Sequence, residues 1–170
     1  NKDSKTYDGT IYGNGYANGR GNDVVYSGFV NGETKSVLSG SLVYGGSAQN
    51  ARNVGSYDIG VGGLSAQNYQ LTYVNGILDI DKATLDLQAA SDSRTYNGTN
   101  TSNGKVTATG LFGTDKVTGL SQSFDSRNAG SRDLLVNNGY VVDDGNGGLN
   151  YAVVTHTASG NIAKATLDLQ

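Results

Sequence analysis

A glycine-rich run of side-chain oxygens near the end of the chain has the composition of a calcium loop. It carries Asp143, Asp144 and Asn146 within the sequence Asp-Asp-Gly-Asn-Gly-Gly. Carboxylate and amide oxygens on such a turn suit Ca²⁺, which extracellular modules often bind weakly. No glutamate follows in the place where an EF-hand loop needs its bidentate ligand, so that loop type is excluded. The alternative is a plain hairpin turn with Asn146-Gly147 at its tip.

A second candidate is the loop over residues 11–23, which holds Tyr12, Tyr16 and Arg20 among glycines and asparagines. Binding loops have this mixture, because tyrosine supplies contact area at low entropic cost and small polar residues adapt to the partner. We expect these three side chains to contact the ligand if the loop binds one, a glycan or a host protein. The alternative is an ordinary hairpin extension, since loops often differ in length between related modules.

The residue types needed for catalysis are scarce. His156 is the only histidine and the chain has no cysteine. Its neighbours Thr155 and Thr157 place it on a strand with a solvent-facing ring, whereas a catalytic triad needs a nucleophile and an orienting acid within hydrogen-bond reach. Aspartate is abundant, but it is also a common turn residue. We therefore expect no enzymatic activity and no cofactor, apart from the possible calcium.

These residues are carried on a tandem repeat. The heptapeptide Lys-Ala-Thr-Leu-Asp-Leu-Gln stands at residues 82–88 and again, unchanged, at residues 164–170. Other matched stretches follow the same period with two insertions, which is the pattern of loops on a shared scaffold. The sequence thus predicts one module at 1–81, a second at 82–164, and the start of a following module at 165–170.

The periodicity of the apolar residues predicts a mainly β protein. Tyr57, Ile59 and Val61 alternate with small or polar residues, as half-buried strands require. Asn-Gly pairs, among them those at Asn31, Asn75, Asn97 and Asn138, are typical of tight hairpin turns. We expect two small antiparallel or mixed-sheet domains.

Each domain is also expected to contain one short helix. The first helix is predicted over residues 31–38, which begin with a capping asparagine and end just before Gly40. The second is predicted at the matching position, residues 113–120. A short irregular turn is the alternative at both places.

The inward-facing side of the chain reverses at the junction between the modules. Leu78 and Ile80 are even-numbered, whereas Leu85 and Leu87 are odd-numbered, so the two runs must serve different sheets. No proline and no Gly/Ser spacer separates them, which predicts a semi-rigid, elongated pair of domains. If the heptapeptide opens a module, residues 165–170 form an orphan strand. We expect them to self-associate by filling the vacant edge of a neighbour's first module.

Composition narrows the class of protein further. The formal net charge is −3 and only 16% of residues are charged, which does not suit a nucleic-acid partner. No apolar run is long enough to span a membrane, and without cysteine there is no disulfide. The 11 tyrosines and the alternating aliphatic residues argue against a disordered linker.

Several motifs resemble the MBG and YDG repeat domains of large secreted bacterial adhesins. The sequence Thr-Tyr-Asp-Gly-Thr at residues 6–10 and its variant with Asn97 are similar to the YDG signature, and Tyr-Ser-Gly-Phe-Val-Asn-Gly-Glu-Thr at 26–34 resembles the MBG pattern. The resemblance is MBG-like over 1–81 and YDG-like over 82–164. It implies filamentous-haemagglutinin-like adhesins, and hence stalk modules at the bacterial surface with roles in cell adhesion and biofilm. It also implies a β-grasp-like fold, with neighbouring repeats and extracellular glycan or matrix as partners.

Overall fold

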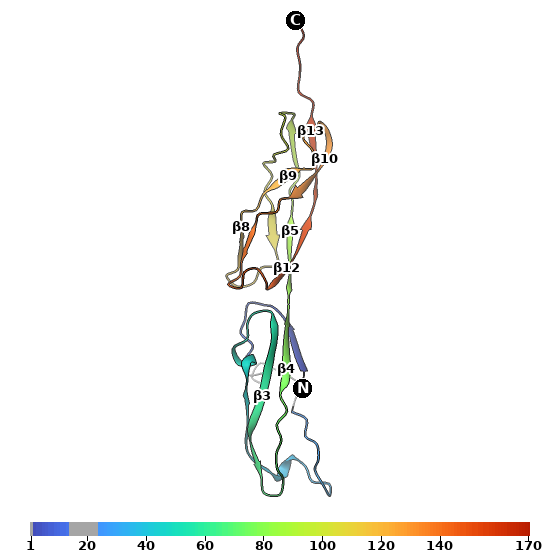
Figure 1. Ribbon diagram of the computed structural model, residues 1–170. Helices are drawn as coiled ribbons and strands as arrows, with labels where there is room; N and C mark the ends of the chain where they lie inside the picture. The colour runs from blue at the N-terminus through green and yellow to red at the C-terminus, as the bar shows by residue number, and fades with distance from the viewer. Residues whose placement is uncertain (1, 14–23) are drawn as a thin grey trace. The chain divides into compact units, whose positions relative to one another are not determined.

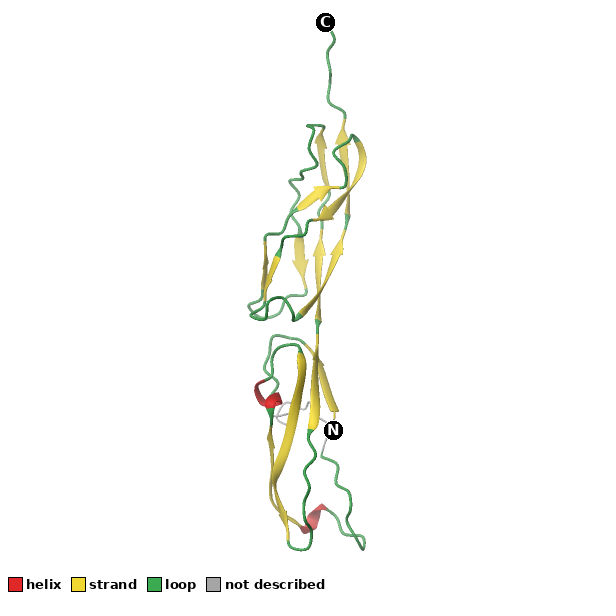
Figure 2. Cartoon of the chain, viewed as in Figure 1, coloured by secondary structure: helices red, strands yellow, loops and turns green. Residues whose placement is uncertain are grey.

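The computed structural model describes residues 2–13 and 24–170, and the chain divides into two compact units, Asn1–Lys82 and Ala83–Gln170. Each unit is built from β-strands joined by loops (Figures 1 and 2). The described part of the first unit contains four strands and two short 3₁₀ helices: β1 (Lys2–Thr6), η1 (Lys35–Val37), β2 (Leu38–Gly45), η2 (Ser47–Asn50), β3 (Gly55–Ala66) and β4 (Gly76–Asp81).

The first unit forms one mixed sheet with the strand order β1-β4-β3-β2. β1 runs parallel to β4, with Lys2 opposite Ile77 and Thr6 opposite Asp81. The other two pairs are antiparallel. A parallel pair needs a long connection, and here that connection includes β2 and β3. The first and last strands of the unit therefore lie side by side.

The second unit contains nine shorter strands: β5 (Ala83–Gln88), β6 (Asp92–Thr95), β7 (Thr107–Thr109), β8 (Lys116–Thr118), β9 (Gln122–Phe124), β10 (Gly130–Val136), β11 (Val141–Asp143), β12 (Tyr151–His156) and β13 (Ala158–Ala163). They form a four-stranded sheet β6-β13-β10-β9, a three-stranded sheet β12-β5-β7 and the pair β11-β8.

The four-stranded sheet of the second unit repeats the sheet of the first. In both, the early edge strand runs parallel to the last strand, and the remaining pairs are antiparallel. The core under the second sheet is made by Ala89, Phe124, Leu134 and Ile162. The sequence repeat is thus a repeat of topology, and the sheets are mixed.

β5 is the strand that the heptapeptide forms, and it is paired on both edges. It runs parallel to β12 and antiparallel to β7. Leu85 and Leu87 on its inner side are fully buried. The loop after β7 approaches it so closely that a Cβ on Gly110, which has φ +98°, would lie 2.4 Å from the carbonyl oxygen of Thr84. Only glycine combines that backbone angle with that approach.

The reversal of the inward side at the junction is present in the structure. β4 buries Leu78 and Ile80, whereas β5, which begins two residues after β4 ends, buries Leu85 and Leu87. A strand's successive side chains point to opposite faces, so the single residue between the strands, Lys82, changes which positions face inward. Each strand therefore serves the core of its own unit.

The helix predictions are partly wrong. In the first unit only Lys35–Val37 is helical within residues 31–38, as a single 3₁₀ turn capped by the Thr34 side chain. In the second unit, residues 116–118 form β8 instead, because Val117 pairs with Val142 of β11. With 3₁₀ turns as the only helices among the described residues, the arrangement with a helix in each domain, expected as β-grasp-like, does not form. No helix in the described part of the chain is long and apolar enough to cross a membrane.

The Asn-Gly pairs do not form the tight hairpins expected of them, and only some of them lie in turns, whereas Gly76 is the first residue of β4. Asn31 and Gly32 both have positive φ, and the Glu33 amide closes their turn on the Val30 carbonyl at 3.0 Å. None of the four pairs named above directly joins two hydrogen-bonded strands as a two-residue loop. The turn at Asn31-Gly32 was therefore readable from the sequence, whereas the extended backbone at Gly76 and the pairing of the strands were not.

Substitution of Gly110 by alanine tests the close approach of its loop to β5. We expect Gly110→Ala to lower the free energy of unfolding of the second unit by about 2–3 kcal/mol, since the new Cβ meets both an unfavourable φ and the Thr84 carbonyl. Gly28→Ala is the control, because Gly28 has a similar φ of +91° with nothing within 4 Å of the added Cβ. Gly28→Ala should lower the free energy of unfolding by about 1 kcal/mol. Urea denaturation measures both, and equal losses would contradict the proposed contact.

Candidate functional site

The repeated motif Thr-Tyr-Asp/Asn-Gly-Thr forms the same turn in both units. The Asp8 carboxylate accepts a hydrogen bond from the Thr10 amide at 2.9 Å, and the Asn97 side-chain oxygen accepts one from the Thr99 amide at 3.1 Å. Such side-chain-to-backbone bonds are the reason that aspartate and asparagine favour turns. The motif is thus a structural device at the end of β1 and of β6.

A cation from the preceding strand holds each of these turns. In the first unit the buried Lys5 ammonium contacts Asp8 at 2.6 Å and the Thr10 carbonyl at 3.2 Å. Burial alone would raise the pKa of Asp8, but hydrogen bonds from Lys5 and Thr10 outweigh it and lower the pKa to about 2. In the second unit Arg94 takes the place of Lys5 and donates to the Thr99 carbonyl. Its guanidinium also lies 5.3 Å from the centre of the Phe124 ring.

The predicted ligand-binding tyrosine of residues 11–23 lies in the core. Tyr12 is 3% exposed and its hydroxyl donates to Asp3 at 2.6 Å. Burial and this hydrogen bond raise the pKa of the phenol. The ring therefore packs inside the first unit rather than forming a contact surface. Tyr16 and Arg20 lie outside the described residues.

The predicted calcium loop is organised by internal hydrogen bonds to Asp144. One carboxylate oxygen accepts from the amides of Asn146 and Gly148, both at 2.8 Å, and the other accepts from the amide of Asn150 at 3.0 Å. Burial alone would raise the pKa of Asp144, but these amides outweigh it and lower the pKa. The Asn146 amide group donates to the Asn150 side chain at 2.9 Å.

The loop is also bonded to the start of β5. Asp143 forms an exposed ion pair with Lys116 at 3.4 Å. The carbonyl of the fully buried Asn150 accepts from the amide of Ala83, the first residue of β5. The loop joins β11 to β12, which belong to different sheets, so it is not the hairpin considered as the alternative.

The only histidine is paired with an aspartate that the sequence analysis did not single out. His156 on β12 lies 2.7 Å from Asp86 on the neighbouring strand β5. Both side chains are more than two-fifths exposed. The pair links the two strands at the surface of the second unit.

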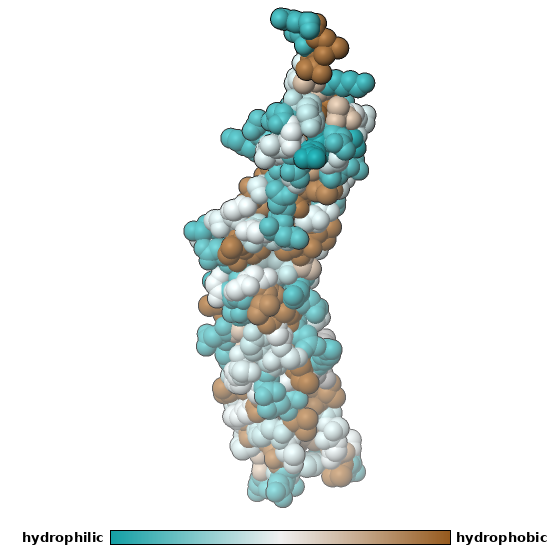
Figure 3. All heavy atoms as spheres, turned by 45° about the horizontal axis from the view of Figure 1, so that its top comes forward, coloured by the Kyte–Doolittle hydropathy of each residue, from teal (hydrophilic) through white to brown (hydrophobic). Residues whose placement is uncertain are grey.

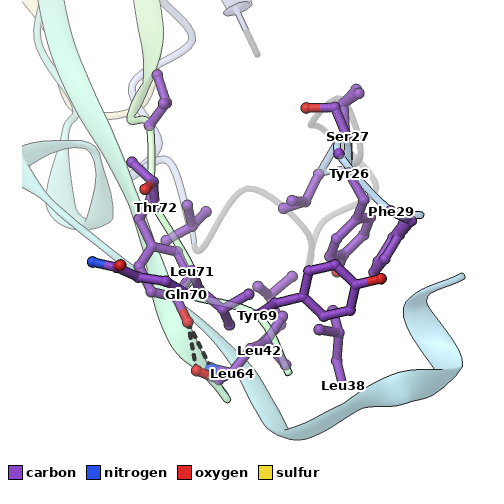
Figure 4. A pocket seen from close by; sticks show the side chains of 16 residues that line it. Tyr26, Ser27, Phe29, Leu38, Leu42, Leu64, Tyr69, Gln70, Leu71 and Thr72 are labelled. Atoms are coloured by element: carbon purple, nitrogen blue, oxygen red, sulfur yellow. Dashed lines mark hydrogen bonds between the residues drawn. The ribbon is translucent and has the colours of Figure 1, made fainter. Parts of the chain in front are cut away.

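The first unit also contains a groove, which was not predicted from the sequence. It has a volume of about 480 Å³ and lies between residues 24–29 and residues 69–74, over apolar side chains of β2 and β3 (Figure 4). Tyr26, Phe29 and Tyr69 line one part of it, with ring centres 6.4 Å and 5.6 Å apart along the series. Further along residues 69–74, the Tyr73 hydroxyl accepts a hydrogen bond from the Leu64 amide at 3.0 Å and donates one to the Leu64 carbonyl at 2.7 Å.

A tyrosine hydroxyl fixes one end of the groove. The Tyr69 hydroxyl accepts a hydrogen bond from the Val30 amide at 3.2 Å and donates to the Glu33 carboxylate. Donation to a carboxylate raises the pKa of the phenol. The two walls are thus tied together, although they are about 40 residues apart in sequence. The sequence signal that could have located these walls was the repeat, because Tyr69 and Gly28 recur one period later as Tyr151 and Gly110.

Exchange of the turn residues between the units tests the role of the cation. Asp8→Asn should lower the free energy of unfolding by about 1–2 kcal/mol at pH 7, because it leaves the buried Lys5 without a counter-charge. The pKa of Asp8 is lower in the folded state than its ordinary value of 3.8. Its contribution is therefore present above about pH 4 and lost as the pH falls toward about 2.

The control is the reverse change, Asn97→Asp, which places a carboxylate near Arg94. It should leave the second unit as stable or more stable. Urea denaturation at pH 7 and pH 3 measures both variants. An Asp8→Asn effect that does not shrink with acid would contradict this account.

Calcium titration tests the loop of Asp144. Both carboxylate oxygens of Asp144 already accept hydrogen bonds from main-chain amides. We therefore expect millimolar Ca²⁺ to leave the melting temperature unchanged. Asp144→Ala should lower the free energy of unfolding by about 2–3 kcal/mol, because it leaves the buried main-chain amides of the loop without a hydrogen-bond acceptor. The neighbouring Asp143→Ala should cost less than about 1 kcal/mol, because its ion pair is exposed. A rise in melting temperature with calcium that Asp144→Ala abolishes would overturn the expectation.

Comparison with known protein families gives two matches that divide the chain as its two units do. Residues 3–79 match the MBG domain (YGX type), and residues 81–159 match the YDG domain. No curated protein and no solved structure matched the chain. The chain therefore consists of an MBG domain followed by a YDG domain.

Proposed function

We propose that the two domains are spacer modules in the stalk of a large secreted or cell-surface bacterial adhesin. In this role they separate an adhesive region from the cell, in the context of cell adhesion and biofilm, outside the cell. Their partners in this role are the neighbouring modules of the same chain. The proposal assigns them no catalytic activity, no cofactor, no nucleic-acid partner and no insertion into a membrane.

The observation that carries the proposal is the repetition of one sheet in both domains. The order of strands and the direction of every pair are the same in β1-β4-β3-β2 and in β6-β13-β10-β9. The side chains shared between the domains are those that hold this scaffold, such as the turn residues Asp8 and Asn97. Repetition of a scaffold with variable loops is typical of arrays whose work depends on length.

A second candidate function is that of a glycan- or host-protein-binding module acting through residues 11–23. The favouring observation is a chain segment rich in tyrosine, glycine and asparagine. The burial of Tyr12 removes one of its three predicted contact residues. A binding surface there would have to rest on other side chains of the segment, Tyr16 and Arg20 among them.

Replacement within a reporter adhesin separates the two functions. The chain is placed between a membrane anchor and an unrelated binding domain on the bacterial surface, and capture of the reporter's ligand by whole cells is measured. Deletion of the chain should reduce capture. Replacement by two unrelated folded domains of similar length should restore it, because a spacer acts through its length.

A glycan and matrix-protein array probed with the full chain provides the other arm. Specific binding that is lost in a Tyr16→Ala, Arg20→Ala variant would support the second function. Failure of the unrelated domains to restore capture in the reporter would contradict the spacer role.

A further inference from the structure

The second domain shows how the heptapeptide is used when it is folded. β5 pairs along its whole length with β12, from Ala83 opposite Tyr151 to Gln88 opposite His156. Its last three residues, 86–88, also pair with β7. Leu85 and Leu87 are 0% exposed in this position. The strand therefore completes both the hydrogen bonding and the core of its domain.

The first domain contains the two flanking segments of this arrangement. Tyr69 and Tyr151 stand one repeat period apart and make equivalent bonds: Tyr151 accepts from the Phe112 amide at 2.9 Å and donates to Asp115 at 2.7 Å. The counterparts of Phe112 and Asp115 are Val30 and Glu33, which bond Tyr69. Residues 69–74 thus correspond to β12 and residues 25–27 to β7.

No strand among residues 2–13 and 24–82 occupies the position of β5 in the first domain. Residues 69–74 belong to no strand, and among the described residues their main chain makes no backbone–backbone hydrogen bond. The groove described above lies between these two segments (Figure 4). The two glycines that flank the position differ accordingly. A Cβ on Gly110 would collide with Thr84 of β5, whereas a Cβ on the equivalent Gly28 would meet nothing within 4 Å.

A strand of matching sequence is exposed in the same chain. Residues 164–170 repeat the sequence of residues 82–88, but Leu167 and Leu169 are 83% and 90% exposed where Leu85 and Leu87 are buried. Hydrophobic residues are visible at this end of the chain in Figure 3. Exposed leucines on one side of an extended segment favour addition to an open sheet position.

We propose that the groove of the MBG domain binds residues 165–170 of a second copy of this chain as an added β-strand. Transfer of the β5 register places Leu167 opposite Leu71 and Leu169 opposite Tyr73, in the parallel direction. On the other edge, Leu169 lies opposite Tyr26 in the antiparallel direction. Both leucines then face the apolar floor of the groove on β2 and β3, and Thr166 and Asp168 face outward.

The strand supplies both kinds of contact that the open position lacks. Its amides and carbonyls pair with the main chain of residues 69–74, and its leucines cover apolar side chains such as Leu42 and Leu64. Six residues must be ordered on binding, so we expect weak association, with a Kd of roughly 10 µM to 1 mM. This binding is independent of the spacer role, because it concerns only which strand fills the groove.

Sedimentation velocity over a range of concentrations tests the strand side of the proposal. The full chain should self-associate, and Leu167→Asn with Leu169→Asn should weaken the association at least tenfold. The control carries Thr166→Ala and Asp168→Asn, which change the outward side of the same segment and should stay within about twofold of the parent. All four positions are exposed in the free chain, so the variants keep its fold.

The groove side is tested with Gly28→Ala and a peptide. A Cβ at residue 28 should collide with the carbonyl of the incoming Thr166, as Gly110 would with Thr84, and reduce self-association at least tenfold. The peptide Lys-Ala-Thr-Leu-Asp-Leu-Gln, added to the chain truncated after Ala163, should shift the amide NMR signals of residues 25–28 and 69–74. A monomeric chain at millimolar concentration, association insensitive to the leucines, or peptide shifts elsewhere would each overturn the proposal. Concentration-independent protection of the groove would do the same, since it would place the segment of the same molecule there.

Discussion

The YDG domain depends on one strand that is bonded on both edges and buried on one side. β5 places Leu85 and Leu87 in the core while its main chain pairs with β12 and β7. Burial of each leucine stabilises the fold by about 1.5–3 kcal/mol, but only if the neighbouring amides and carbonyls find partners. The other devices of the domain serve this strand. The Asp144 loop positions the Asn150 carbonyl, which accepts a hydrogen bond from the Ala83 amide. Gly110 allows the loop after β7 to approach Thr84 of β5.

The MBG domain has the same scaffold around that position, and none of its described residues forms a strand there. Its sheet has the same order, its turn motif has the same hydrogen bond, and Tyr69 ties the same two walls. Between the walls lies a groove whose floor is made of apolar side chains of β2 and β3. The two domains therefore share one architecture, and among the described residues only the YDG domain has a strand at this shared position.

The class of fold and the inward side of strands such as β4 and β5 could be predicted from the sequence, because both follow from period-two alternation. The reversal at Lys82 and the equivalence of the two halves were readable for that reason. Strand partners were not, since β1 with β4 and β5 with β12 join segments separated by most of a domain. The predicted helix at residues 113–120 was wrong because Val117 and Thr118, which are β-branched, find partners in β11.

The candidate sites show a different limit. An aspartate on a glycine-rich turn accepts equally well from a metal ion or from amides, so composition could not reveal that Asp144 bonds its own loop. Tyr12 has the residue type of a contact surface, and only the tertiary structure places it in the core. The groove was missed because its walls are distant in sequence. The repeat period applied to Tyr151 and Gly110 would have located both walls at Tyr69 and Gly28.

An identical strand does not have identical neighbours in the two domains. Leu87 lies opposite Ala108 and Thr155, whereas the corresponding positions in the MBG groove are Tyr26 and Tyr73. The aromatic rings offer a strand more apolar area than alanine and threonine do. A strand joined covalently to its groove also has the advantage of a high effective concentration, which a strand from another molecule lacks. The larger apolar contact at Tyr26 and Tyr73 therefore favours binding of a strand from another molecule. The balance between this contact and the effective concentration of a linked strand decides whether such an array pairs within one molecule or between two.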